Sequence, residues 1–360
     1  MNDLLSRNKM PIIVGGTNYY IESLLWKVLV DSTSTTQLKH SMKRKFDYNE
    51  SDSDGQRHVI NSFTKEQMNT IESKLLHEYL RHIDPVTANK LHPNNKRRII
   101  RAIEIYNASG KLMSSVLHEQ RTQDGGSNLG GPLRYKNILL FWLHCEQEVL
   151  NKRLDARVDS MVESGLLDEI REFHENFVKP YGDRDYTKGI LQTIGFKEFI
   201  PYLEKFDSDE DKMISLIMKN KETSGEIPES LNLLNECLDQ LKLATIRYSK
   251  NQNKWVKNRF LGNLRRDVPP LYKLDTTDPS KWQEDIFERA VEIIQAFIED
   301  RPSKIEPEKR IPGSKDEYSD ETTNMCIICD RVFIGEYQWR IHNKSNKHKK
   351  ILSKKKQFIE

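Results

Sequence analysis

The feature that most constrains this chain is a set of four metal-ligating side chains near its carboxyl end. Two cysteines are separated by two residues, a histidine follows after twelve further residues, and a second histidine after five more. The set is Cys326, Cys329, His342 and His348, with the spacing of a two-cysteine, two-histidine zinc finger. A module this small cannot fold on apolar burial alone, so Phe333 and Trp339 are expected to pack beside the metal. We therefore predict a structural zinc ion held by these four side chains.

The composition places this module beside a larger folded region. At 360 residues and 42.3 kDa the chain has room for one full domain and one or two smaller ones. Cys145 and Cys237 lie far apart without a pairing pattern, which is typical of a reducing compartment. Met1–Met10 contain no apolar run of signal-peptide length, and no segment reaches the roughly twenty apolar residues of a membrane helix. We expect a soluble protein.

Positive charge is concentrated at the carboxyl end. The net charge is only +3, but from Asn324 onward nine Lys or Arg face three acids, so this tail carries +6 and the remainder −3. A basic tail beside a zinc finger suits the phosphates of a nucleic acid. The alternative is a solvated Lys-rich terminus without a partner.

Hydrophobic patterning predicts a parallel α/β core. Pro11–Val14, Gly15–Thr17 and Asn18–Trp26 indicate a buried strand, a tight turn and a helix, the unit from which parallel sheets are built. Asn137–Leu143 predicts a second buried strand after a Gly-rich loop at Asp124–Pro132. Further helices are predicted at about Gln147–Glu163, Leu166–Phe177 and Ser230–Phe260, with a loop at Asp207–Pro228.

Two other regions interrupt or follow this core. Residues 31 to 62 are polar and charged, and apolar residues such as Leu76 and Leu80 then recur at helical spacing, which predicts a helical insertion. Three prolines and many charges between Arg301 and Thr323 predict a flexible linker. The predicted boundaries are 1–30 and 132–300 for the core, 31–131 for the insertion, 301–323 for the linker and 324–360 for the finger with its basic tail.

Two clusters in the first half of the chain offer groups that bind anions. Gly15-Gly16-Thr17 at a helix start presents backbone N–H groups and a hydroxyl to a phosphate, or is only a turn with a Thr cap. Arg97, Arg98 and Arg101 lie within about a turn of one another on a predicted helix. They either grip phosphates by bidentate contacts or pair with Glu104 at the surface.

A third cluster follows one face of the predicted helix at Ser230–Phe260. The spacing of three, four and three puts four cations on that face, with Trp255 beside them: Arg247, Lys250, Lys254 and Lys257. Basic residues with an aromatic ring suit an RNA backbone and a stacked base, and the alternative is a solvated face. No Gly-x-x-x-x-Gly-Lys-Ser/Thr phosphate loop occurs in the sequence, and Ser109-Gly110-Lys111 is predicted to be a helix C-cap.

Taken in order, these motifs resemble the tRNA dimethylallyltransferase (isopentenyltransferase) family in its eukaryotic form with a C-terminal finger. The resemblance runs through most of the chain. Its most specific parts are the decapeptide Pro11–Tyr20, Asp84-Pro85 with Leu91–Glu104, Arg153–Arg157 with Met161 and Gly165–Leu167, Gln192–Glu198, and Thr245–Trp255.

The resemblance implies transfer of a dimethylallyl group from its diphosphate to N6 of the adenine just 3′ of a tRNA anticodon, with the base flipped out of its loop. It implies Mg²⁺ with the diphosphate and a carboxylate that takes the proton of the attacking amine. Carried over by position, the residues near the diphosphate are Thr17, Arg153 and Arg157. Those that hold the tRNA are Arg97, Arg98, Arg101, Gln192, Lys197, Lys250, Gln252 and Trp255. The implied partners are a tRNA anticodon stem-loop and dimethylallyl diphosphate, bound by a monomer.

One departure from the family concerns the beginning of the chain. The family opens with a strand, a phosphate loop and an Asp-Ser motif whose Asp is the general base, and none of these precedes Pro11. Asp31-Ser32 comes after the Gly-Gly-Thr unit, in the wrong order, so no general base is assigned. We therefore expect a P-loop-NTPase-like parallel α/β core that lacks its first units, in an amino-terminally truncated transferase. Asn251 also stands where the family usually has Arg.

These absences predict that the polypeptide alone does not catalyse the transfer. The alternative function is a non-catalytic RNA-binding zinc-finger protein, which holds tRNA with the same basic surfaces. A nucleotide kinase is a third alternative, and the finger and the missing phosphate loop both count against it. The predicted location is the cytoplasm, with the nucleus and the mitochondrion as alternatives.

Overall fold

The computed structural model describes residues 1–28, 64–182, 185–186, 189–220, 227–311 and 322–357. The predictions for residues 31–63, including Asp31-Ser32, and for residues 312–321 of the linker lie outside this part of the chain. The described chain divides into two compact units. Unit 1 comprises residues 1–137, 260–268 and 310–360, and unit 2 comprises residues 138–259 and 269–309.

Unit 1 opens with α1 (Asn2–Ser6) and α2 (Asn18–Leu25). The helix predicted after the Gly-Gly-Thr turn is confirmed, but the strand predicted at Pro11–Val14 is wrong. Ile12 and Val14 are 79% and 91% exposed there. A strand exists only when a neighbour supplies hydrogen-bond partners, and the described residues of unit 1 place no strand beside this segment.

A buried ion pair under an indole joins α2 to residues 260–268. Arg266 Nη1 lies 2.6 Å from Glu22 Oε1, and both side chains are almost fully buried. The guanidinium sits 4.0 Å from the centroid of the Trp26 ring. Trp26 is itself fully buried, stacks on Phe260, and donates its indole N–H to the carbonyl of Asp267. Burial of the charges requires this pairing, because an isolated buried ion is strongly unfavourable.

The segments that lead into and out of the predicted insertion lie side by side. Gly131 N–H donates to Lys27 O, and Lys27 N–H donates to Pro132 O, each at 3.0 Å. A bridge also joins Trp26 and Leu133. A Cβ on Gly131 would lie 2.9 Å from Lys27 O, so this close approach requires glycine.

The helices of the predicted insertion pack around their own core. They are α3 (Lys65–Thr70), α4 (Ser73–Ile83), α5 (Pro85–Asn89), α6 (Lys96–Ser109) and α7 (Met113–Thr122). Leu76 and Leu80 of α4 pack with Ile99 and Ile103 of α6 in one apolar cluster, as their helical spacing predicts. This cluster leaves the opposite face of α6 to the solvent.

Asp84 ties three of these helices together. It follows α4 and caps α5 by accepting the Thr87 N–H and hydroxyl at 3.0 and 2.7 Å, and it also accepts the Ser114 N–H of α7 at 2.9 Å. Burial by itself raises the pKa of this carboxyl group, but the hydrogen bonds from Ser114 and Thr87 outweigh it and the pKa is lowered. Asp84 is therefore buried in its charged form.

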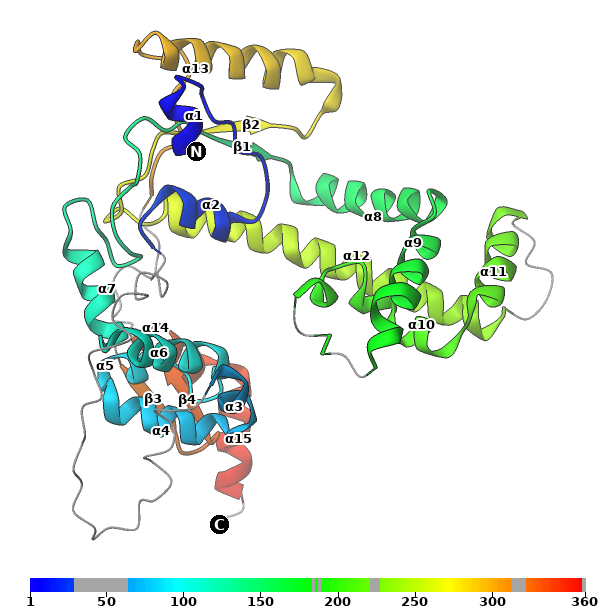
Figure 1. The fold of residues 1–360 in the computed structure, drawn as a ribbon, viewed down its shortest axis with the longest axis horizontal. Coiled ribbons are helices and arrows are strands. Elements are labelled where there is room, and N and C mark those ends of the chain that lie inside the picture. The colour runs from blue at the N-terminus through cyan, green and yellow to red at the C-terminus, as the bar shows by residue number, and fades with distance from the viewer. Residues whose placement is uncertain (29–63, 183–184, 187–188, 221–226, 312–321, 358–360) are drawn as a thin grey trace. The chain divides into compact units, whose positions relative to one another are not determined.

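Unit 2 contains the parallel sheet that the strand pattern predicts. β1 (Leu140–His144) pairs in parallel with β2 (Leu271–Asp275), with Leu140 opposite Leu271 (Figure 1). The strand predicted at Asn137–Leu143 is thus confirmed with a shift toward its carboxyl end. η8 (Trp282–Glu288) lies against β2 and leads into α13 (Arg289–Ile298). The α/β class with a parallel sheet is confirmed.

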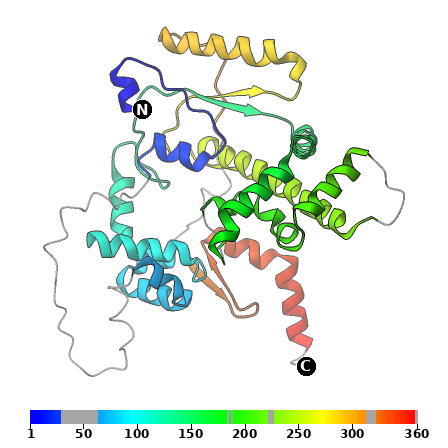
Figure 2. The ribbon, with the colours of Figure 1, turned by 45° about the vertical axis from the view of Figure 1, so that its right-hand side comes forward.

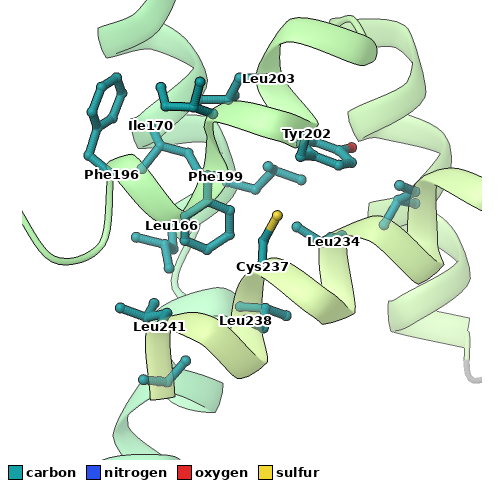
Figure 3. Close-up of a cluster of buried hydrophobic side chains, with 14 of the residues drawn as sticks. Leu166, Ile170, Phe196, Phe199, Tyr202, Leu203, Leu234, Cys237, Leu238 and Leu241 are labelled. Carbon is teal, nitrogen blue, oxygen red and sulfur yellow. The ribbon is translucent and has the colours of Figure 1, made fainter. Parts of the chain in front are cut away.

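The remaining helices of unit 2 are α8 (Gln147–Glu163), α9 (Leu166–Phe173), α10 (Ile200–Lys205), α11 (Ser208–Asn220) and α12 (Glu229–Trp255). Short 3₁₀-helical and π-helical segments connect them: η2 (His174–Val178), η3 (Lys179–Tyr181), η4 (Gly189–Gln192) and η5 (Lys197–Phe199). η6 (Val256–Leu261) extends α12, and η7 (Pro279–Lys281) precedes η8. Leu166, Phe199, Tyr202, Leu234 and Leu241 meet in their common core (Figure 3).

The loop predicted at Asp207–Pro228 is wrong, because α11 begins at Ser208. The acids that suggested a loop lie in the first turn of α11, where their negative charge interacts favourably with the positive end of the helix dipole. Asp211 also turns inward and binds Arg171 of α9 through two hydrogen bonds of 2.7 and 3.0 Å. Tyr202 donates to the same carboxylate at 2.7 Å. Pairing with the buried Arg171 thus allows this acidic segment to pack as a helix.

Candidate metal centre and nucleic-acid interface

The carboxyl-terminal residues form a hairpin followed by two helices (Figure 2). These elements are β3 (Thr323–Cys326), the antiparallel β4 (Arg331–Ile334), α14 (Glu336–Lys344) and α15 (Asn346–Gln357). Cys326 ends β3, Cys329 lies in the turn, His342 belongs to α14 and His348 to α15. The fold thus brings together the four ligands predicted from their spacing.

Three of the separations between ligand atoms are close to those around a zinc ion. His348 Nδ1 lies 3.6 Å from Cys326 Sγ, 3.4 Å from Cys329 Sγ and 3.1 Å from His342 Nε2, and all four ligand atoms lie within 4.8 Å of one another. A tetrahedral zinc ion with ordinary Zn–S and Zn–N bonds separates its ligand atoms by about 3.3–3.8 Å. The donor set therefore fits a structural zinc ion.

Two aromatic rings support one of these ligands. The Phe333 ring stacks on the His342 ring with centroids 4.0 Å apart, and Trp339 lies 5.9 Å from the same ring. The packing predicted for these two side chains is confirmed. The outer surface of the module is basic, because its lysines are exposed on α14 and α15: Lys344, Lys347, Lys349, Lys350 and Lys354.

The long helix of unit 2 carries the predicted basic face. Arg247, Lys250 and Lys254 on α12 and Lys257 on η6 are all exposed, while Gln252 and Trp255 are half-buried beside them. No acid interrupts the sequence between Arg247 and Arg259. The face therefore presents several positive charges within reach of one nucleic-acid backbone, with an indole ring beside it.

One contact on this face was not predicted from the sequence. The guanidinium carbon of Arg259 lies 4.8 Å from the centroid of the Trp255 ring, within the range of a cation–π interaction. The four-residue spacing of the two side chains is the signal that indicates such a pair. Arg259 is therefore added to the residues of the candidate RNA-binding surface, next to Trp255.

The arginines of α6 lie on the exposed side of the insertion helices. Arg97, Arg98 and Arg101 are all exposed. Arg101 Nη1 lies 3.6 Å from Glu104 Oε2, with 44% of the Arg101 side chain exposed. The surface pairing considered for this cluster thus exists for Arg101. Such exposed pairs contribute little stability, so the pairing leaves Arg101 able to bind a phosphate.

The two candidate diphosphate residues of α8 have different surroundings. Arg153 donates to the carbonyl oxygens of Thr276 and Thr277, each at 2.7 Å, which ties α8 to the segment that follows β2. Arg157, one turn further along α8, is exposed. The Arg153 guanidinium is thus engaged by backbone oxygens, while that of Arg157 faces the solvent.

The other predicted site residues lie on turns. Gln192 ends η4 and Lys197 begins η5, and both are exposed. Glu198 accepts the Gly195 N–H at 2.9 Å, which closes the turn between them. Thr17 is exposed at the N-cap position of α2.

The predicted site residues are divided between the two units. Thr17, the α6 arginines and the zinc ligands belong to unit 1, whereas the candidates on α8, η4, η5 and α12 belong to unit 2. Outside the finger, the described residues contain no grouping of three or more His, Cys, Asp or Glu side chains with converging ligand atoms. In the part of the chain that the structure describes, none of the helices has both the length and the apolar character of a membrane span.

Residues 1–259 match the IPP transferase family, and residues 324–349 match a zinc-finger double-stranded RNA-binding family. The human tRNA dimethylallyltransferase is 39% identical over 99% of this chain and 69% of its own length. The Saccharomyces cerevisiae tRNA dimethylallyltransferase is 31% identical over 98% of this chain and 73% of its own length. A crystal structure of a eukaryotic dimethylallyltransferase acting on tRNA superposes with a TM-score of 0.70 at 29% identity, covering 99% of this chain and 77% of that one.

Proposed function

The chain belongs to the IPP transferase family, and on that premise we propose how its residues serve tRNA prenylation. It is a tRNA dimethylallyltransferase, a transferase that modifies tRNA. We propose that the acceptor is N6 of the adenine 3′ of the anticodon and that the donor is dimethylallyl diphosphate. The observation that carries the RNA half of this proposal is the exposed basic face of α12 with Trp255 beside it.

The proposed reaction moves one bond and one proton. The exocyclic amine of the adenine attacks the allylic carbon, a C–N bond forms, and the C–O bond to the diphosphate breaks. The diphosphate leaves with the bonding electron pair, and the amine loses a proton to a base. Positive side chains favour this step because negative charge accumulates on the leaving group.

Within unit 2, Arg157 is the better placed of the two arginines proposed for the diphosphate. Its exposed side chain is available for a bidentate contact with phosphate oxygens. Arg153 would orient α8 through Thr276 and Thr277. Thr17 is proposed to contribute its hydroxyl and backbone N–H from the α2 end. Mg²⁺ bound with the diphosphate stays a prediction from the resemblance. Magnesium usually binds substrate phosphates together with one or two carboxylates.

The basic surfaces are proposed to hold the anticodon stem-loop. Lys250 and its neighbours on α12 would contact phosphates of the loop, Trp255 would stack on an unpaired base, and Gln192 and Lys197 would border the flipped base. The α6 arginines and the basic surface of the finger would contact backbone phosphates elsewhere on the RNA. The match of the finger to a double-stranded RNA-binding family supports the proposed contact between the finger and RNA.

A transfer assay tests the proposal directly. The purified 360-residue chain, loaded with zinc, is incubated with labelled dimethylallyl diphosphate, Mg²⁺ and a 17-nucleotide anticodon stem-loop RNA. A matched RNA with guanine in place of the acceptor adenine lacks the N6 amine and serves as the control. Label in the adenine RNA alone supports the transfer proposed here and contradicts the sequence-based prediction that this polypeptide alone does not catalyse it.

Binding of both RNAs by the same preparation is measured in parallel. Tight binding without label in either RNA supports the alternative, a protein that holds RNA without chemistry, which the RNA-binding family of the finger favours. Light scattering on the same sample tests the proposed monomer, which is expected near 42.3 kDa.

A further inference from the structure

Trp255 and Arg259 form a cation–π pair at the carboxyl end of α12. The Arg259 guanidinium lies 4.8 Å from the Trp255 ring centroid, and both side chains are half-buried. An indole that is half-buried exposes part of its surface. The cation and the ring together restrict the rotamers of both side chains, since each gives up attraction when it moves.

The backbone at this point departs from the α-helix. α12 ends at Trp255, and η6 begins at Val256 with π-helical geometry. No α-helix resumes directly after η6 in the described chain, so this π-helical segment is the carboxyl end of the long helix. Trp255 stands at the junction, immediately after the exposed Lys254 and before the exposed Lys257. Both lysines are thus available to phosphates of an RNA that meets this part of the helix.

We propose that Arg259 is a positioning residue that holds the Trp255 indole in place as a stacking platform for an unpaired base of the RNA loop. The inference rests on the proposed function, because it needs Trp255 to face RNA. Preorganisation is the physical gain: a ring already held in one rotamer loses less conformational freedom when the base stacks on it. Arg259 acts through the ring, whereas the exposed Lys254 and Lys257 act through phosphates.

Two variants of the complete zinc-loaded chain separate these roles, with a 17-nucleotide anticodon stem-loop RNA as the probe. Arg259→Met keeps the length of the side chain and removes the cation, and we expect RNA affinity to fall about fivefold. Trp255→Ala removes the platform, and stacking is expected to contribute a loss of about tenfold. In the Trp255→Ala background, Arg259→Met should have no further effect, because the ring it positions is gone.

The salt dependence of binding distinguishes a positioning role from a phosphate contact. Lys254→Gln should reduce the slope of log affinity against log salt by about 0.7 for a single-stranded contact, and Arg259→Met should leave that slope unchanged. A fivefold loss that persists in the Trp255→Ala background, or a slope reduced as in Lys254→Gln, would overturn the proposal and make Arg259 a phosphate ligand. Arg259→Lys, which keeps the charge but not the planar group, should bind RNA with intermediate affinity and guards against misfolding of the Met variant.

A measurement without RNA separates this inference from the proposed function. Acrylamide quenching of Trp255, obtained as the difference between chains with and without Trp255→Phe, should increase when Arg259 is changed to Met. Increased quenching with unchanged RNA affinity in Trp255→Ala would mean that the positioning holds and that the RNA role of the ring is wrong. Unchanged quenching would overturn the positioning itself.

Discussion

The buried charge pair of unit 2 supports the most demanding prediction. Asp211 of α11 receives two hydrogen bonds from Arg171 and one from Tyr202, and the Arg171 and Asp211 side chains are only 8% and 5% exposed. Asp211→Ala leaves the guanidinium buried with the carbonyl of Leu203 as its remaining hydrogen-bond acceptor in the described structure. Removing one partner of a buried ion pair costs about 3–5 kcal/mol, and we expect that loss in unit 2.

The same helix offers a matched control. Asp209 lies two residues earlier, with its side chain 84% exposed, and pairs with Lys212 at 2.7 Å. Asp209→Ala should change stability by no more than about 1 kcal/mol, because exposed ion pairs are weak. Tyr202→Phe removes one buried hydrogen bond and should cost about 1 kcal/mol. Arg171→Met combined with Asp211→Leu should recover much of the loss, since no unpaired charge remains.

Hydrogen exchange followed by mass spectrometry is the suitable assay. The chain has two units, so its global unfolding does not define a single free energy, whereas exchange reports the opening of each helix separately. A loss of 3–5 kcal/mol accelerates exchange of the α9, α11 and α12 amides by at least about 100-fold, at 1.4 kcal/mol for each factor of ten. Equal, small changes in Asp211→Ala and Asp209→Ala would refute the claim that this ion pair holds α11 in place.

Three further predictions concern the metal centre, the basic face and acid stability. Cys326→Ser, or zinc removal with a chelator, should unfold the finger and lower stem-loop affinity by about tenfold, while circular dichroism shows the other helices intact; unchanged affinity across a salt series would contradict a role in RNA binding. Lys254→Gln should lower the salt slope of RNA binding as above, whereas Lys242→Gln, on the same helix but paired with a carboxylate at 2.6 Å, should leave it unchanged. Burial raises the pKa of Asp84, but its hydrogen bonds outweigh burial and hold the pKa below its ordinary 3.8. The stability that the charged carboxylate contributes is therefore complete above that pH and is lost as pH falls toward the folded pKa. Asp84→Asn should therefore destabilise the insertion helices at neutral pH and weaken their acid sensitivity, and an unchanged acid unfolding midpoint would argue against this origin.

Local spacing was sufficient for the elements whose partners lie nearby in sequence. The zinc ligands span only Cys326 to His348, and the metal imposes their geometry, so four positions and three intervals predicted the centre. The helix at Gln147–Glu163 has the bounds predicted for it, and the basic face of α12 follows directly from helical periodicity. The α6 cluster was predicted for the same reason, because one helix determines both its buried and its exposed face.

Tertiary contacts decided the features that depend on residues distant in sequence. The apolar run Pro11–Val14 predicts a strand as an isolated segment, but a strand requires a neighbour, and the described residues supply none there. The acidic segment after Asp207 predicts a loop, until Arg171, forty residues away, offers Asp211 a buried partner. Arg153 likewise gave no sign that its guanidinium binds carbonyls more than a hundred residues along the chain.

The sequence by itself therefore determined the family, the metal ligands and the faces of the long helices, because each is encoded by residue type at short, regular intervals. Only the tertiary structure decided which charges are buried as partners and which stay exposed to meet a ligand. The physical reason is that the free energy of a charged side chain depends on its solvation and on its nearest opposite charge. Both are set by packing between segments that the local pattern does not connect.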